Sequence, residues 1–452
     1  IGEGEAVYDD LLDLYKTCGS RKEFLEKAAL IPGIYVPSFY DVSYNDDFTI
    51  KAVTAKGNAP AAVKRVIAAD LDAAPYPEDP IIPYTRTIQD RLVLEIQRGC
   101  IRGCRFCQAG MIYRPIRRRS PEKLKEIVDK MIAATGYEEI TLSSLSSSDY
   151  PDLLEIINYL TEDHKEDKLN ISLPSLRIDS FSLDIMSRIQ DIRKVSLTFA
   201  PEAGSQRLRD VINKGIDHDE IISGASEAFN GGWSRVKLYF MFGLPTETDD
   251  DVRAISDLCN DIANVFYEIP KDKRPAPGRV EITCSTSFFV PKPFTPFQWA
   301  RQNTSEEFLT KQHILRHAIN ESRNHRSIRY SWHDSDTTYM EGIFARGDRR
   351  LSRVIRRAYE KGCIYDAWND QFRYDKWMEA FLEEGVDPDF YLRERSYDEI
   401  LPWDHIDTGV SREFLIAEAE RAKNGIVTPN CAEKCSACGC AAFRTGICTE
   451  KR

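Results

Sequence analysis

Between residues 90 and 300 the chain alternates short apolar runs with longer amphipathic stretches. Apolar runs rich in Val, Ile, Leu and Phe are typical of buried strands, and the stretches between them have helical spacing. We expect strands at 92–97, 139–142, 170–173, 195–199, 236–242 and 280–288. We expect helices at 121–134, 151–163, 181–189, 205–213, 218–230 and 249–266. Such strand–helix repeats predict an α/β fold, a (β/α)6 partial barrel of the TIM type over residues 91–300.

The chain on either side of this region has other patterns. Residues 1–40 indicate a loop, an amphipathic helix and an extended connector with prolines, and residues 41–90 are interpreted as a linker. Residues 301–425 are predicted to be mainly helical, with helices at 306–323, 350–361 and 377–384. Residues 426–452 form a Cys-rich tail. The first residue is Ile rather than Met, which suggests a piece of a longer protein.

Composition narrows the class of protein. Hydrophobic residues make up 42% of the 452 residues, enough for a buried core, but no run approaches the ~20 apolar residues of a membrane span. No basic-then-apolar signal sequence is visible, so we expect a cytoplasmic protein without a membrane partner. The net charge of −11 gives no overall attraction to nucleic acid. Twelve cysteines in such a protein favour metal ligation over disulfide bonds.

Three cysteines directly after the first predicted strand carry the clearest chemical signal. Cys100, Cys104 and Cys107 have the spacing C-x3-C-x2-C, and an aromatic residue, Phe106, precedes the third cysteine. Three thiolates on one loop can hold three irons of a 4Fe–4S cluster and leave the fourth iron open for chemistry. A structural zinc site would be closed by a fourth ligand, and the nearest other cysteines lie at positions 18 and 259.

This motif resembles that of the radical S-adenosylmethionine (radical SAM) enzymes, in which the amino and carboxylate groups of SAM chelate the fourth iron. The resemblance covers about residues 91–299 and implies a partial barrel, a 4Fe–4S cluster, SAM, and an electron donor such as flavodoxin or ferredoxin. Residues 1–40 resemble the closing segment of a cobalamin-binding domain, with a plain N-terminal helix and linker as the alternative. Cobalamin would then be bound through a domain that this chain lacks.

Ligands collect at the carboxyl ends of barrel strands, so each predicted strand exit is a candidate for SAM binding. Ser143 and Ser144 follow the second strand and can accept from the SAM ammonium group, although the family's Gly-Gly-Glu form is missing. Ser175 and Arg177 follow the third strand, where an arginine can hold the SAM carboxylate in a two-pronged pair. Alternatively, the serines form a turn that caps a helix, and Arg177 is a surface residue paired with an aspartate.

The fourth and fifth strand exits also resemble family motifs. Glu202 lies in a sequence similar to the Glu-Gly-Ser exits of methylthiotransferase-like and cobalamin-linked radical SAM proteins, and it can bind ribose hydroxyls or the SAM ammonium group. Gly243 and Leu244 begin a turn similar to the family's Gly-x-Pro-x-Glu turn, where an apolar backbone edge meets adenine. Helix capping is the alternative role for Glu202 and for the end of the second turn.

Residues 332–350 are dense in groups able to bind a polar substrate. The candidates are His333, Asp334, Glu341, Arg346 and Arg349. Arginines here and near residue 117 form local basic patches that can contact RNA phosphates, so the substrate is expected to be RNA or protein. A solvated helix surface is the alternative. Beyond residue 300 the chain resembles uncharacterised radical SAM proteins fused to cobalamin-binding domains, which supplies no substrate.

The tail contains a second cysteine motif. Its members are Cys431, Cys435, Cys438, Cys440 and Cys448. The first three repeat the C-x3-C-x2-C spacing, and so short a segment needs a metal to organise it. A second 4Fe–4S cluster and a zinc ion both require four thiolates, so the spacing leaves both open, and the last two cysteines compete for the fourth position.

Together these features predict a radical SAM enzyme that cleaves SAM to a 5′-deoxyadenosyl radical. Methyl transfer through cobalamin to an unactivated carbon is the expected next step. One alternative is a methylthiotransferase-like enzyme acting on RNA or protein. Another is a non-catalytic iron–sulfur or zinc scaffold.

Overall fold

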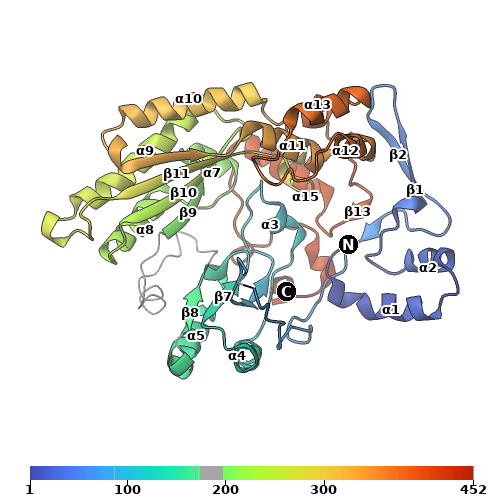
Figure 1. Cartoon of the computed structure of the whole chain (residues 1–452), viewed down its shortest axis with the longest axis horizontal. Coiled ribbons are helices and arrows are strands. Elements are labelled where there is room, and N and C mark those ends of the chain that lie inside the picture. Colours follow the sequence, from blue (N-terminus) through green and yellow to red (C-terminus); the bar gives the residue numbers. More distant parts are fainter. Residues whose placement is uncertain (86, 168, 174–196, 451–452) are drawn as a thin grey trace.

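The computed structural model describes residues 1–85, 87–167, 169–173 and 197–450. Two parallel sheets form the region of strand–helix repeats (Figure 1). The first has the order β4-β7-β8, with strands Leu92–Glu95, Glu139–Ser143 and Asn170–Ser172. The second has the order β12-β11-β10-β9, with strands Ile328–Trp332, Glu281–Phe288, Arg235–Phe242 and Leu197–Glu202. In both sheets each strand pairs with the next parallel strand along the chain, as in a barrel.

Helices connect these strands. They are α4 (Pro121–Thr135), α5 (Leu153–Asn158), α7 (Gln206–Val211), α8 (His218–Asn230), α9 (Asp249–Glu268) and α10 (Ser305–Glu321). The α/β class is confirmed, and strands lie in all six predicted places. Closure of the two sheets into one partial barrel stays a prediction, and the helix expected at 181–189 lies outside the described residues. Strand β12 was not predicted.

Local sequence explains where these helices begin. Ser120 caps α4 by accepting a hydrogen bond from the Lys123 amide, Pro121 occupies the first turn, and Gly136 ends the helix with a left-handed φ of 65°. Helices α8 and α9 begin with capping boxes at Asp217 and Thr248. The predicted helix at 151–163 is α5 continued by a π-helical turn, Tyr159–Asp163.

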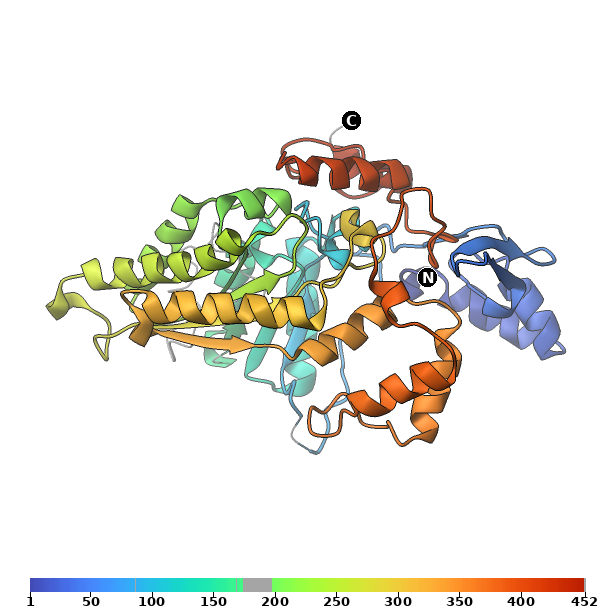
Figure 2. The same ribbon diagram turned by 90° about the horizontal axis from the view of Figure 1, so that it is seen from above.

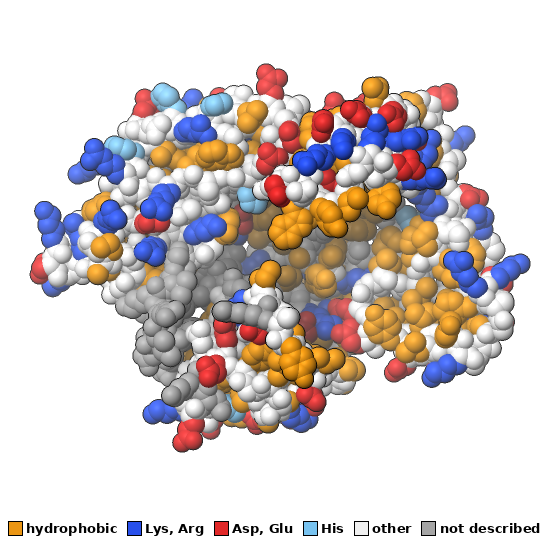
Figure 3. Space-filling model, in the orientation of Figure 1, with side chains coloured by type: hydrophobic (Ala, Val, Ile, Leu, Met, Phe, Trp, Pro, Cys, Tyr) orange, Lys and Arg blue, Asp and Glu red, His pale blue; other side chains and the backbone are white. Residues whose placement is uncertain are grey.

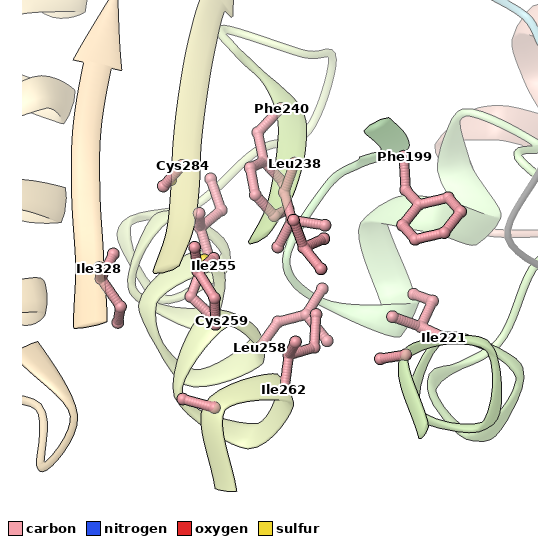
Figure 4. Packing of buried hydrophobic residues seen from close by; sticks show 14 of the residues in the cluster. Phe199, Ile221, Leu238, Phe240, Ile255, Leu258, Cys259, Ile262, Cys284 and Ile328 are labelled. Carbon is pink, nitrogen blue, oxygen red and sulfur yellow. The ribbon is translucent and has the colours of Figure 1, made fainter. Parts of the chain in front are cut away.

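The largest hydrophobic core lies between the second sheet and helices α8 and α9 (Figure 4). Alternate residues of β10 are fully buried against the helices, among them Leu238 and Phe240. Ile255 and Ile262 of α9 meet them from the helix side. Because strand side chains alternate between faces, Met241 points to the other face of the sheet. There it packs in a separate cluster with Phe106 of the cysteine loop.

The chain outside the repeats adds a hairpin and many helices. The N-terminal segment has α1 (Tyr8–Thr17), α2 (Arg21–Ala28), β1 (Tyr40–Tyr44), β2 (Ile50–Ala55) and β3 (Val63–Lys64). Residues 41–90, interpreted as a linker, therefore contain most of a β-hairpin, and β3 pairs with β13 (Ile406–Asp407). The C-terminal helices are α11 (Ser335–Arg346), α12 (Leu351–Glu360), α13 (Tyr374–Glu383), α14 (Asp389–Leu392), α15 (Arg412–Lys423) and α16 (Ile447–Glu450).

Segments from both ends of the chain lie near the cysteine loop. In two perpendicular views the N-terminal segment and the sheet of β9 to β12 lie at opposite ends of the molecule, with C-terminal helices between them (Figure 1, Figure 2). Short elements frame the loop itself, namely β5 (Gln97–Arg98), α3 (Gln108–Ile112) and β6 (Arg117–Arg118). None of the described helices combines the length and apolarity needed to cross a bilayer.

Candidate functional site

The cysteines of the first motif lie on the loop between β5 and α3. Cys107 is the N-cap of α3, and its Sγ accepts a hydrogen bond from the Gly110 amide at 3.3 Å. The Cys100 Sγ accepts from the Arg102 amide at 3.4 Å. Burial raises the pKa of Cys100 to about 12, and the neighbouring Cys104 and Cys107 thiolates add to this rise. Since the three thiols repel one another when ionised, they need a cation to be held as thiolates.

The donor set of the loop consists of three thiols. Within the described residues, no three His, Cys, Asp or Glu side chains converge as they do around a single ion. The three thiols, with N–H groups directed at two sulfurs, match the surroundings of a cluster with three protein ligands.

Two arginines of the cysteine loop fix its shape. Arg102 forms a two-pronged pair with Asp149, at 2.6 and 3.0 Å, and so ties the loop to the exit of β7. The Arg105 side chain is fully buried, and its Nε atom pairs with the Glu418 carboxylate of α15 at 3.0 Å. Arg105 also donates to backbone carbonyls of Val211 and Ile426. Buried paired charges of this kind hold one geometry, because each nitrogen has a set partner.

Glu202 lies beside the cysteine loop, as predicted from the fourth strand exit. It ends β9 with a left-handed φ of 68°, and its Oε1 lies 3.1 Å from the Lys214 Nζ. Lys214 in turn lies 5.9 Å from the centre of the Phe106 ring. Burial raises the pKa of Cys107, and the nearby charges of Lys214 and Glu202 lower and raise it respectively. Cys107, Phe106, Glu202 and Lys214 thus form one site. Lys214 was missed, because its turn shows no chemical pattern in the sequence.

The predicted serines of the second strand exit form a hydrogen-bonded turn. The Ser143 carbonyl accepts from the Ile96 amide at 3.1 Å, and the Ser144 hydroxyl lies 3.0 Å from the Ser147 hydroxyl. This turn carries Asp149, the partner of Arg102. Ser175 and Arg177 lie outside the described residues.

The fifth strand exit forms a closed turn beside a cavity. Gly243 has a φ of 80°, and its amide donates to Glu247 at 2.8 Å. Glu247 is 2% exposed and pairs with Lys311 at 2.7 Å. Gly243 and Leu244 line a cavity of about 880 Å³, together with Trp299 and other residues of the C-terminal region.

The five predicted substrate residues have separate roles in the fold. Asp334 caps α11 through the Thr337 amide, Glu341 pairs with Lys292, and His333 is exposed. Arg346 is fully buried, and each of its nitrogens donates to a backbone carbonyl. Arg349 donates to Tyr40 and Pro37 carbonyls and to the Tyr35 hydroxyl. Their role toward a substrate stays a prediction.

The face in front of α3 is open. In the orientation in which α3 lies at the centre of Figure 1, the space-filling view shows a hollow below α11 and α12, with hydrophobic side chains along its upper rim (Figure 3). Next to the cysteine loop, Phe289 and Phe297 form a buried apolar cluster with Leu244 and Phe106. The Gln108 side chain donates to the Pro293 carbonyl at 3.1 Å, which ties α3 to this segment.

The tail packs directly on the cysteine loop of the barrel region. The Cys431 amide donates to the Ile101 carbonyl at 2.9 Å, and Cys431 and Cys448 share an apolar cluster with Ile101 and Ile116. Burial raises the pKa of Cys448 to about 11, and the thiolates of Cys438, Cys431 and Cys435 act in the same direction. Four tail thiols therefore lie within electrostatic range of one another.

The fifth tail thiol has a different environment. Cys440 is fully buried in an apolar cluster, and its thiol donates to the Gly409 carbonyl at 3.5 Å. A hydrogen bond from Cys440 lowers the pKa of Cys438 to about 5, and the Arg114 guanidinium contributes to this although burial opposes it.

Known proteins with similar sequences identify the family. Residues 94–259 match the Radical SAM superfamily. Over 343 residues the chain is 31% identical to Uncharacterized protein MJ0966 of Methanocaldococcus jannaschii, covering 76% of this chain and 71% of that protein. It is 26% identical over 190 residues to the Putative methylthiotransferase MJ0865 of the same organism, covering 39% of this chain and 41% of that protein. The chain belongs to the radical SAM superfamily, whose members are enzymes that use a 4Fe–4S cluster and SAM.

Solved structures are less similar to this chain than these relatives are. TsrM of Kitasatospora setae, a radical SAM methyltransferase with bound cobalamin and [4Fe-4S] cluster, has a TM-score of 0.36 at 15% identity, covering 47% of this chain and 38% of that chain. The cobalamin-dependent radical enzyme OxsB has a TM-score of 0.41 at 12% identity, covering 93% of this chain and 62% of that chain. With TM-scores below 0.5, these matches add nothing to the family assignment.

Proposed function

We propose that Cys100, Cys104 and Cys107 hold the 4Fe–4S cluster at which this enzyme cleaves SAM. The supporting observation is the cysteine loop itself, which presents three mutually close thiols, two of them accepting backbone N–H groups. When bound, such a cluster supplies the electron that splits SAM into methionine and a 5′-deoxyadenosyl radical. Family membership implies this cofactor pair, and the three thiols of the loop leave the fourth iron open for SAM.

The surrounding residues have distinct tasks in this proposal. Arg102 and Arg105 hold the loop in shape from opposite sides, so that the sulfurs keep their spacing when the cluster binds. Glu202 offers a carboxylate beside Cys107 for the ribose hydroxyls or the ammonium group of SAM, and Lys214 holds that carboxylate in place by an ion pair. The apolar cluster with Phe106 restricts water near the reacting atoms.

Other SAM contacts follow from the strand exits. Ser143 and Ser144 would face the ammonium group, Arg177 with Ser175 the carboxylate, and Gly243 with Leu244 the adenine edge. For the net reaction we propose radical methyl transfer with cobalamin as the methyl carrier. Methylthiolation of RNA or protein is the second candidate, because one relative is named a putative methylthiotransferase.

The test of this function is SAM cleavage by the purified chain. The protein is reconstituted anaerobically with iron and sulfide, reduced, and mixed with SAM, and 5′-deoxyadenosine is measured by chromatography. We expect cleavage by the wild type and by Cys18→Ala, a matched control on the N-terminal helix pair, and none by Cys104→Ala. Cleavage by Cys104→Ala refutes the ligand assignment. No cleavage by the well-loaded wild type supports the scaffold alternative instead.

A labelled methyl group separates the two reactions. With SAM that carries a deuterated methyl group and an RNA or protein that co-purifies with the chain, a product with only the labelled methyl group supports methyl transfer. A product that also gains sulfur supports methylthiolation.

A further inference from the structure

Arg114 is a buried cation next to the cysteine tail. It is 3% exposed, its Nε donates to the Gly110 carbonyl at 3.1 Å, and one Nη donates to the Arg102 carbonyl at 3.2 Å. The other Nη is buried without a hydrogen-bond partner, and no carboxylate among the described residues pairs with the side chain. A buried cation without a counter-charge is costly, so this position calls for an anionic group.

The tail thiols are the groups that face this cation. Cys431 and Cys438 act on the charge of Arg114 from the tail side, while the two backbone carbonyls bind it from the barrel side. Four thiolates around a 2+ metal centre carry a net charge of about −2, which supplies the missing counter-charge.

We propose that the tail binds a second 4Fe–4S cluster through Cys431, Cys435, Cys438 and Cys448, with Arg114 as its buried counter-ion. This goes beyond the function proposed above and does not depend on it. The four thiols lie within range of one another, and Cys431 and Cys448 share one apolar cluster. The backbone on both sides of Cys438 is left-handed, with φ of 56° at Ala437 and 103° at Gly439.

Cys440 is assigned a supporting role rather than a ligand role. The Cys440 sulfur is fully buried and lies 3.5 Å from the Gly409 carbonyl, in an apolar cluster that also contains Trp403, Phe414 and Cys438. Cys448 instead shares an apolar cluster with Cys431 and with Ile101 of the cysteine loop. We therefore place Cys448 in the fourth ligand position.

We assign the tail an iron–sulfur cluster rather than a zinc ion. The tail repeats the C-x3-C-x2-C spacing of the barrel loop. In the described residues neither group has its donors gathered at the distance of a single ion. A cubane separates its ligand sulfurs more widely than one zinc ion, for which Zn–S is about 2.3 Å.

The test uses the full chain with the barrel ligands removed, so that failure of the first cluster cannot affect the result. In a Cys100→Ala/Cys104→Ala/Cys107→Ala background we expect about four irons per chain after anaerobic reconstitution, with visible iron–sulfur absorbance. Adding Cys435→Ala or Cys448→Ala should abolish the iron, while Cys440→Ala should keep it. Cys435 is exposed, so its removal takes away no packing and circular dichroism should show an unchanged fold.

Each contrary outcome overturns a named part of the proposal. About one zinc per chain, and no iron, overturns the iron–sulfur assignment. Iron lost with Cys440→Ala but kept with Cys448→Ala overturns the ligand set. Neither metal in the background variant overturns the site. Arg114→Met in the same background should lower the reduction potential of the cluster, and Arg114→Lys should restore most of it; an unchanged potential in Arg114→Met overturns the counter-ion role.

Discussion

Glu418→Gln should lower the free energy of unfolding of the protein, although Glu418 lies outside the cysteine loop. Glu418 is 1% exposed, accepts from the Arg105 Nε at 3.0 Å, and accepts from the Thr428 hydroxyl at 2.8 Å. The amide keeps the shape but removes the charge, which leaves the fully buried Arg105 without a counter-ion. Breaking such a pair costs about 3–5 kcal/mol, and since glutamine still accepts one hydrogen bond we expect about 3 kcal/mol, more than a hundredfold in the folding equilibrium.

The assay is urea unfolding of the cluster-free protein, followed by iron content after reconstitution. The matched control is Glu420→Gln on the same helix, whose exposed pair with Lys423 is worth only about 0.3–0.5 kcal/mol. We expect a lower urea midpoint and less iron in Glu418→Gln alone. Equal midpoints for the two variants, with full iron loading in both, would refute the idea that Arg105 and Glu418 shape the loop.

Three further predictions concern separate parts of the fold. Glu202→Gln should weaken SAM binding about ten- to a hundredfold, because one charged hydrogen bond is lost. Unchanged affinity by calorimetry would mean that Glu202 pairs with Lys214 and does not bind SAM. Gly204→Ala should cost about 1–3 kcal/mol in unfolding free energy, because its Cβ would lie 2.2 Å from the Ile255 amide nitrogen; an unchanged melting temperature would contradict this close contact. Burial raises the pKa of Asp251, but hydrogen bonds from Arg207 and others lower it to about 2. The stabilising effect of the Asp251 carboxylate is therefore complete above the unfolded pKa of about 4 and is lost as pH falls toward 2. The difference in melting temperature between the wild type and Asp251→Asn should shrink across that range. A constant difference would refute the assignment.

The parts of the fold that the sequence predicted are those with strong periodicity. Strand β10 alternates buried and half-buried residues from Val236 to Phe242, and the cap residues of α4, Ser120 and Gly136, can be identified in the sequence. Strand β12 was missed because only Ile328 of its five residues is buried, so its pattern is mostly polar. It lies at the sheet edge and is recognisable only from its pairing with β11.

The site was predictable where one short motif carries it. Cys107 and Phe106 are adjacent in sequence, and Glu202 follows a clear strand, so the sequence alone singled out all three; the structure brings them together, and their roles stay predictions. Lys214 was not, since its place beside Glu202 depends on the turn after α7. The roles of Arg105 and Glu418 were also hidden, because partners separated by 313 residues leave no local pattern.

That separation has a consequence for how the protein is made. The cysteine loop is synthesised long before the groups that shape it, because Glu418 and Ile426 follow Arg105 by 313 and 321 residues and Cys431 comes later still. Domains tend to fold in the order in which they leave the ribosome, and contacts between distant residues form slowly. The loop therefore gains these contacts only when the chain has been extended 313 residues beyond Arg105. Cofactor loading that needs the shaped loop follows synthesis of the segment that carries Glu418.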